Sequence, residues 1–123
     1  MDRKSFERLV EKAVDSIPET FSRYLENVAF LVEDEPDGET LASLGMEYPE
    51  DLLGLYEGDP ITERGADAWG MLPDHIILYK RPIELYAEDY GEPPVKVIRD
   101  TILHEVGHFF GLDEDDLKRM GLD

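Results

Sequence analysis

Two histidines and a glutamate near the end of the chain have the spacing of a metal site. His104, Glu105 and His108 form an HExxH motif, which continues through Gly111 to Glu114. On a helix, histidines four residues apart lie on one face about 6 Å apart along the axis, so both imidazoles can reach one metal ion. Imidazole and carboxylate ligands suit Zn2+, whose catalytic sites keep a fourth position for water. Glu105 is then the base that takes a proton from that water.

The segment around the motif carries the signals of a helix. Pro93-Pro94 precedes it, no glycine or proline interrupts 95–106, and Gly111 supplies a stop signal. Apolar residues repeat along one line of this helix and predict a buried stripe: Val95, Ile98, Ile102, Val106 and Phe109. The two histidines fall on another line, together with Val97 and Thr101. We therefore expect them to line a cleft rather than to enter the core.

A third ligand must complement the two histidines, because catalytic zinc usually has three protein ligands. Glu114 is the first candidate, since it follows His108 by six residues, the spacing at which the pattern HExxHxxGxxH places its third histidine. The intervening glycine can turn the chain back toward the site. Asp113 and Asp116 are the alternatives, and Asp113 can also cap a last helix over 113–120. A carboxylate ligand weakens the ion as a Lewis acid, which favours slow hydrolysis.

Other residues with chemical potential have weaker support. His75, at the start of a predicted strand, can bind a metal or stabilise an oxyanion, but a structural role is the preferred interpretation. Trp69 lies in a turn-rich loop over 58–70, for which a surface connection is preferred to a lid over a cleft. Three tyrosines can polarise a carbonyl, and the sequence selects none of them: Tyr79, Tyr86 and Tyr90.

The composition bounds the kind of protein. A chain of 123 residues is expected to form one domain over 1–123, and its lack of cysteine excludes disulfides and cysteine-ligated zinc. Thirty acidic against twelve basic residues give a formal charge of -18, which repels nucleic acid and is typical of a solvating surface. The N-terminal segment has the pattern of a charged helix rather than a signal peptide, and no apolar run reaches the roughly 20 residues of a membrane span. We expect a cytoplasmic protein.

The order of predicted elements indicates an α+β domain, in which a small mixed or antiparallel sheet packs on the metal helix and further helices surround it. Apolar periodicity and turn residues place these elements in order: a helix over 2–17, a strand over 28–32, a short helix over 41–44, strands over 52–56 and 74–79, a helix over 82–89, the metal helix and a terminal helix.

The second half of the chain resembles the small zincin-like metallopeptidase family of bacteria. The resemblance covers about Leu52 to Gly121 and is carried by three segments: LLGLYEGDPITERG at 52–65, LPDHIILYKRPIE at 72–84 and VIRDTILHEVGHFFGLDEDDLKRMG at 97–121. It implies a minimal zincin-like fold, with His104, His108 and Glu114 as zinc ligands and Glu105 as base.

Three functions follow as hypotheses. The first is a zinc-dependent peptidase whose peptide or protein substrate lies extended along an edge strand, for which Asp74 to Tyr79 is the candidate. The second is a zinc-binding module that keeps the site and recognises a peptide or protein without cutting it. The third is a purely structural metal site, which a closed shell of four ligands would mark.

Overall fold

The structure, a computed structural model, describes residues 1–22, 25–58, 74–109 and 114–119. For six helical residues it describes the backbone and not the side chain: Thr20, His108, Phe109, Glu114, Asp116 and Leu117. The predictions for Trp69, Gly111 and Asp113 lie outside the described residues.

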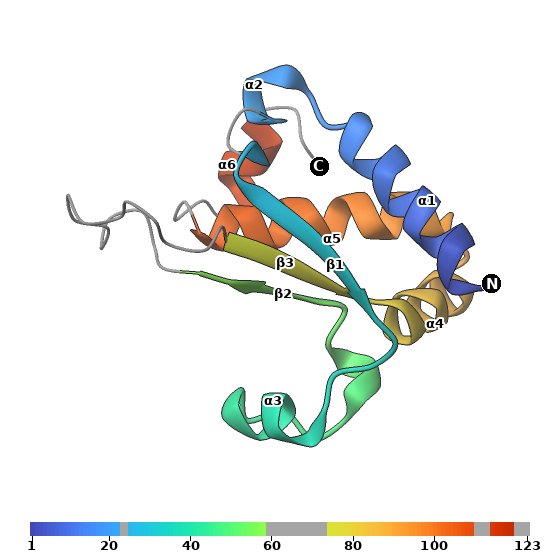
Figure 1. The fold of residues 1–123 in the computed structure, drawn as a ribbon. Helices are drawn as coiled ribbons and strands as arrows, with labels where there is room; N and C mark the ends of the chain where they lie inside the picture. Colours follow the sequence, from blue (N-terminus) through green and yellow to red (C-terminus); the bar gives the residue numbers. More distant parts are fainter. Residues whose placement is uncertain (23–24, 59–73, 110–113, 120–123) are drawn as a thin grey trace.

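The chain forms an α+β domain, as predicted (Figure 1). The helices are α1 (Arg3–Asp15), α2 (Glu19–Ser22), α3 (Gly38–Ser43), α4 (Lys80–Tyr90), α5 (Pro94–Phe109) and α6 (Glu114–Arg119), with a 3-10 turn, η2 (Pro49–Asp51). The strands are β1 (Val28–Glu33), β2 (Gly54–Glu57) and β3 (Asp74–Tyr79). Every predicted element is present, the strand over 74–79 with the predicted bounds and the others with shifted ends, and α2 and η2 are additions to the predicted set.

The three strands form a mixed sheet in the order β1-β3-β2. β1 pairs parallel to β3, with Val28 opposite Asp74, and β2 pairs antiparallel to β3, with Gly54 opposite Leu78. The prediction that Asp74 to Tyr79 is an edge strand is therefore wrong, because β3 has a neighbour on each side. Its last four residues are all buried, which is how a central strand packs.

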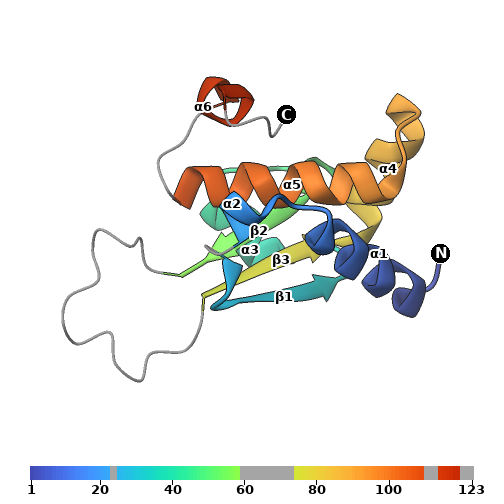
Figure 2. The same cartoon turned by 90° about the horizontal axis from the view of Figure 1, so that it is seen from above.

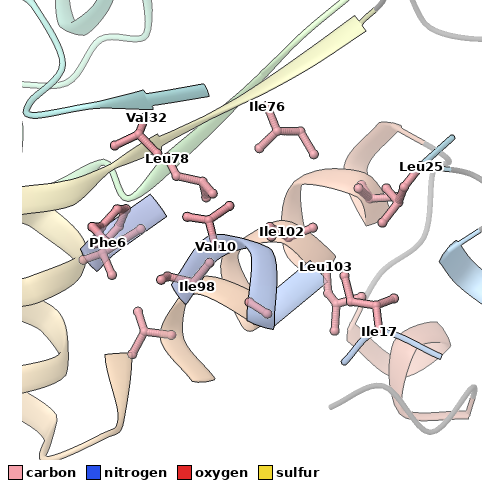
Figure 3. Packing of buried hydrophobic residues seen from close by; sticks show 14 of the residues in the cluster. Phe6, Val10, Ile17, Leu25, Val32, Ile76, Leu78, Ile98, Ile102 and Leu103 are labelled. Atoms are coloured by element: carbon pink, nitrogen blue, oxygen red, sulfur yellow. The ribbon is translucent and has the colours of Figure 1, made fainter. Parts of the chain in front are cut away.

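One face of the sheet packs against α1 and α5, which also contact each other (Figures 1 and 2). The core between these layers is apolar, and Figure 3 shows its side chains pointing toward one another from both helices and from β3. Its most buried members include Phe6, Ile76, Leu78, Ile98 and Ile102, each 0% exposed. This packing fixes α5 against the sheet and so fixes the residues that α5 presents on its other face.

Local signals explain where α1 begins and where α4 ends. α1 begins after Asp2, whose side chain accepts a hydrogen bond from the Ser5 amide at 2.8 Å and so caps the helix. α4 ends at Gly91, which has a φ of 64° in the left-handed region that glycine adopts without strain. None of the described helices combines the length and the apolar content needed to cross a membrane.

Tyr79 should make the protein sensitive to alkaline pH. Burial, together with the nearby charges of Glu33 and Glu57, raises the pKa of Tyr79 to about 12. Its contribution to stability is full below the ordinary pKa of about 10 and is lost as the pH rises through about 12, up to about 3 kcal/mol. In urea unfolding at a series of pH values from about 8 to about 11, the wild type should lose stability more steeply than Tyr79→Phe. Equal slopes would contradict this assignment.

Candidate metal centre

The helix that carries the HExxH motif forms as predicted. α5 begins at Pro94 and continues through Phe109, so His104, Glu105 and the backbone of His108 lie on one uninterrupted helix. The side chain of His108 lies outside the described residues. The helical spacing that lets two histidines reach one ion is therefore present in the backbone.

The two faces of α5 differ as the sequence predicts. Ile98 and Ile102 are 0% exposed and Val106 is 1% exposed, so the apolar stripe lies in the core. His104 is exposed and Glu105 is half-buried. His104 and Glu105 therefore lie beside the buried stripe, on a side of the helix that a ligand can reach.

A cleft of about 680 Å³ runs along α5, and we call it the α5 cleft. His104, Thr101 and Val97 of the predicted line contact it from α5, and so does Glu105. Val97 is only 3% exposed and also belongs to the core. Lys96, Asp100 and Leu103 of α5 also line it, and the rest of the lining comes from outside this helix: Asp51, Leu52, Leu53, Gly54, Tyr86, Glu92 and Lys118. The candidate base Glu105 and the candidate ligand His104 thus line one cleft, which is large enough for part of a peptide.

The third ligand stays a prediction. Glu114 is the first residue of α6, which contacts α5, but its side chain lies outside the described residues, as does that of Asp116. Lys118 of α6 lines the α5 cleft, so this helix does reach the site. The described side chains alone contain no group of three histidine or carboxylate residues able to hold an ion. That finding leaves the predicted set untested, because two of its members fall outside those side chains.

His75 has a different environment. It lies on β3, and its Nε2 is 2.7 Å from Oε2 of Glu57 on the neighbouring strand β2. It is not among the residues that line the α5 cleft. This cross-strand pair agrees with the preferred structural interpretation of His75.

Of the three tyrosine candidates for polarising a carbonyl, one lines the α5 cleft. Tyr79 is 1% exposed in the core, and Tyr90 is 68% exposed outside the cleft. Tyr86 lines the α5 cleft, and its ring centroid is 4.4 Å from that of Tyr90, which supports it from the solvent side. Sequence reasoning missed this distinction because it depends on how α4 packs beside α5.

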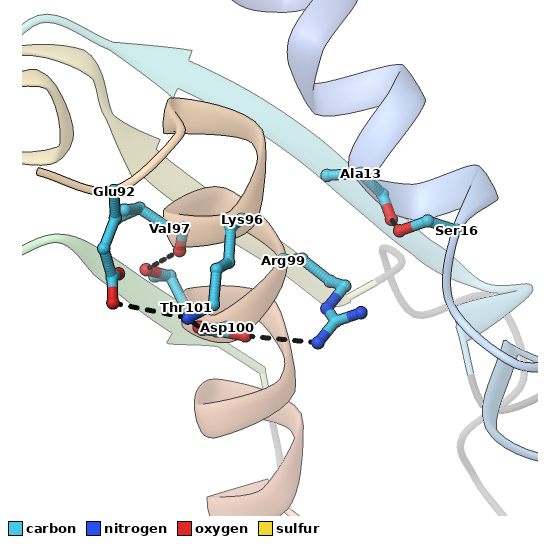
Figure 4. A network of polar contacts seen from close by, with 8 residues as sticks. All are labelled: Ala13, Ser16, Glu92, Lys96, Val97, Arg99, Asp100 and Thr101. Carbon is cyan, nitrogen blue, oxygen red and sulfur yellow. Dashed lines mark hydrogen bonds and ion pairs between the residues drawn. The ribbon is translucent and has the colours of Figure 1, made fainter. Parts of the chain in front are cut away.

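Charged residues of α5 and of the turn before it are paired with one another (Figure 4). Lys96 Nζ lies 2.9 Å from Asp100 Oδ2 and 3.4 Å from Glu92 Oε1. The hydrogen bond and charge of Asp100 raise the pKa of Lys96, so the ammonium stays protonated beside these carboxylates. Arg99 Nη2 also lies 3.6 Å from Asp100. The end of the cleft near Glu92 is therefore polar, with Lys96 between two carboxylates.

Gly54 lets β2 approach α5 closely at the cleft. A Cβ atom at this position would lie 2.7 Å from Cγ2 of Thr101 and 3.1 Å from the carbonyl oxygen of Ile77. Both distances are shorter than side-chain contacts normally allow, so a methyl group would separate the strand from the helix. The position of the strand beside the motif therefore depends on this glycine.

Gly54→Ala should lower the free energy of unfolding by about 1–3 kcal/mol, the usual cost of overpacking. Adding Thr101→Ser should recover part of the loss, because it removes Cγ2 and keeps the Oγ1 bond to the Val97 carbonyl oxygen at 2.7 Å. Urea unfolding of the two single variants and the double variant measures this coupling. Strictly additive effects would show that the Thr101 methyl is not the obstacle.

Comparisons with known proteins identify one family and one similar solved structure. The family model described as zincin-like metallopeptidase matches residues 25–122. A solved structure of a conserved hypothetical protein from Thermus thermophilus is similar to this chain at 27% identity and a TM-score of 0.55, covering 99% of this chain and 100% of that one. No curated protein matches the chain.

Proposed function

Because the chain belongs to the zincin-like metallopeptidase family, we propose that it hydrolyses peptide bonds at a zinc ion held by His104, His108 and Glu114. Glu105 is the general base in this proposal. The observation that carries it is the placement of His104 and Glu105 as consecutive residues of α5 that both line the α5 cleft. A ligand and a base thus meet in the space where a substrate can bind.

The residues present fit a zinc site by their chemistry. Zinc takes imidazole nitrogen and carboxylate oxygen, and His104 offers an imidazole that is exposed on the cleft side of the helix. When bound, zinc supplies a Lewis acid that makes water more acidic and polarises a carbonyl group. His104 and His108 would hold it from α5, and Glu114 would do so from the first turn of α6.

Glu105 is suited to move the proton in this reaction. It is half-buried beside His104, so its carboxylate can reach water in the cleft without being fully solvated. It would take a proton from the attacking water and pass it to the amine of the leaving peptide. Tyr86 lines the same cleft from α4 and is our candidate to donate a hydrogen bond to the developing oxyanion.

We propose that the substrate lies extended beside β2. This replaces the prediction that it lies beside β3, which is the central strand. β2 has β3 on one side and no other strand among the described residues on the other. It contacts α5, and Gly54 at its start lines the α5 cleft. An extended peptide can pair with the backbone of such an edge, which gives affinity without requiring a particular side chain.

The test is cleavage of an unbiased peptide library by the zinc-loaded protein, with and without a chelator, and again after zinc is restored. We expect cleavage that the chelator stops and zinc recovers. Peptide binding without cleavage in the zinc-loaded state would favour the non-hydrolytic binding module. Cleavage that is insensitive to the chelator would contradict the proposed chemistry.

A further inference from the structure

A second groove, of about 850 Å³, lies between α1 and β1 and shares no residue with the α5 cleft. We call it the β1 groove. Four consecutive strand residues line it, from Phe30 to Glu33. Successive side chains of a strand point to opposite faces, so a groove that touches four in a row follows the edge of the strand. β3 occupies one edge of β1, and the β1 groove therefore runs along the other.

The backbone at this edge is able to accept a partner. β1 pairs only with β3 among the described strands, and an edge strand presents amide and carbonyl groups that can pair with another chain. One of these carbonyl oxygens, that of Val32, already accepts a hydrogen bond from outside the sheet, donated by Arg3 Nη2. The six residues of β1 span about 20 Å, enough for a short peptide strand.

The walls of the β1 groove combine apolar contact with negative charge. Val10, Val14 and Phe30 line it with apolar side chains, and Leu31 adds one that is 44% exposed. Four carboxylates and one guanidinium complete the lining: Glu7, Glu11, Asp15, Glu33 and Arg3. Arg3 Nε lies 3.5 Å from Oε1 of Glu7 and forms an ion pair with it. The other three carboxylates leave an excess of negative charge around the free edge of β1.

We propose that the β1 groove binds an extended, basic polypeptide segment as an added strand on β1. Alternate side chains of such a segment would contact the apolar wall, and its lysines or arginines would face the carboxylates of α1. A second copy of this chain is disfavoured as the occupant, because two acidic rims would meet and each chain carries a formal charge of -18. This surface is independent of the proposed metal centre.

The probe is a fluorescein-labelled octapeptide of alternating lysine and valine, followed by fluorescence anisotropy with the full chain. A chelator in the buffer keeps metal-dependent cleavage out of the measurement. At about 50 mM salt the wild type should bind saturably, and Glu7→Gln with Glu11→Gln should weaken binding about tenfold. The matched control is Glu47→Gln with Glu88→Gln, which removes the same charge from positions outside both sites. It should change the affinity less than about twofold.

A second probe separates strand pairing from attraction by charge alone. The same peptide methylated at all internal amide nitrogens keeps its lysines but cannot donate to the carbonyls of β1, and it should not bind. The proposal fails if the wild type does not bind the first peptide, if both variant pairs weaken binding equally, or if the methylated peptide binds as well. It also fails if sedimentation shows a dimer that excludes the peptide, since the occupant would then be a second copy. Circular dichroism checks that the variants fold.

Discussion

Glu105→Gln should abolish peptide hydrolysis while zinc still binds. Glutamine keeps the size and shape of the side chain, but its neutral amide cannot take a proton from water. General-base catalysis contributes about 100-fold to 10,000-fold, so turnover should fall by at least the lower figure. Zinc content should stay unchanged, because Glu105 is not one of the proposed ligands. The measurements are peptide cleavage rates and elemental analysis of the same preparations.

The control for this change is Glu92→Gln, which also neutralises a carboxylate that lines the α5 cleft. Glu92 lies at the far end of the cleft and pairs with Lys96 at 3.4 Å, so its loss should alter the rate only a few-fold. Hydrolysis that persists at the wild-type rate in Glu105→Gln would remove Glu105 from the reaction. Loss of zinc together with activity would instead assign Glu105 a ligand role.

Ile102→Ala should lower the free energy of unfolding by about 2–5 kcal/mol, the usual range for isoleucine in a core. Ile102 is 0% exposed and packs from α5 into the cluster that includes Phe6 and Ile76. A domain of this kind is stable by only about 5–15 kcal/mol, so this loss is a large share of the total. Urea unfolding measures the change.

The matched control is Leu44→Ala, since Leu44 is 45% exposed and its truncation should cost less than about 0.5 kcal/mol. If both variants lose the same stability, α5 is not held by the core as described. Ile102 lies two residues before His104, so a destabilised Ile102→Ala should also release zinc at a lower urea concentration than the wild type.

The sequence predicted α5 well because its signals are local. A proline pair precedes the helix, and the apolar period of Ile98, Ile102 and Val106 defines its buried face. The opposite placement of His104 follows from the same period, since about 3.6 residues complete a turn. Nothing distant in the chain was needed to find the motif helix or the direction that His104 faces.

The order of strands was less accessible from the sequence, and one signal was misinterpreted. The run from Ile76 to Tyr79 is apolar at every position, which is typical of a strand covered on both faces. It therefore favoured a central strand over the predicted edge strand. The position of β2 beside α5 could not be predicted, because it depends on the close approach of Gly54 to Thr101. These two residues are far apart in the sequence.

The composition of the α5 cleft also required the folded structure. Tyr86 comes from α4, Leu52 from the segment before β2, and Lys118 from α6. These residues carry no common motif, and they meet only because three separate elements pack around α5. The motif indicated the chemistry, while tertiary packing decides which side chains surround it.

The most direct test of the metal centre is the zinc content of the purified wild type, His104→Ala and His75→Ala by elemental analysis. We expect one zinc per chain in the wild type and in His75→Ala, whose histidine instead pairs with Glu57 at 2.7 Å. His104→Ala should lose the ion. Zinc retained by His104→Ala, or absent from the wild type after zinc is supplied, would contradict a metal centre on α5.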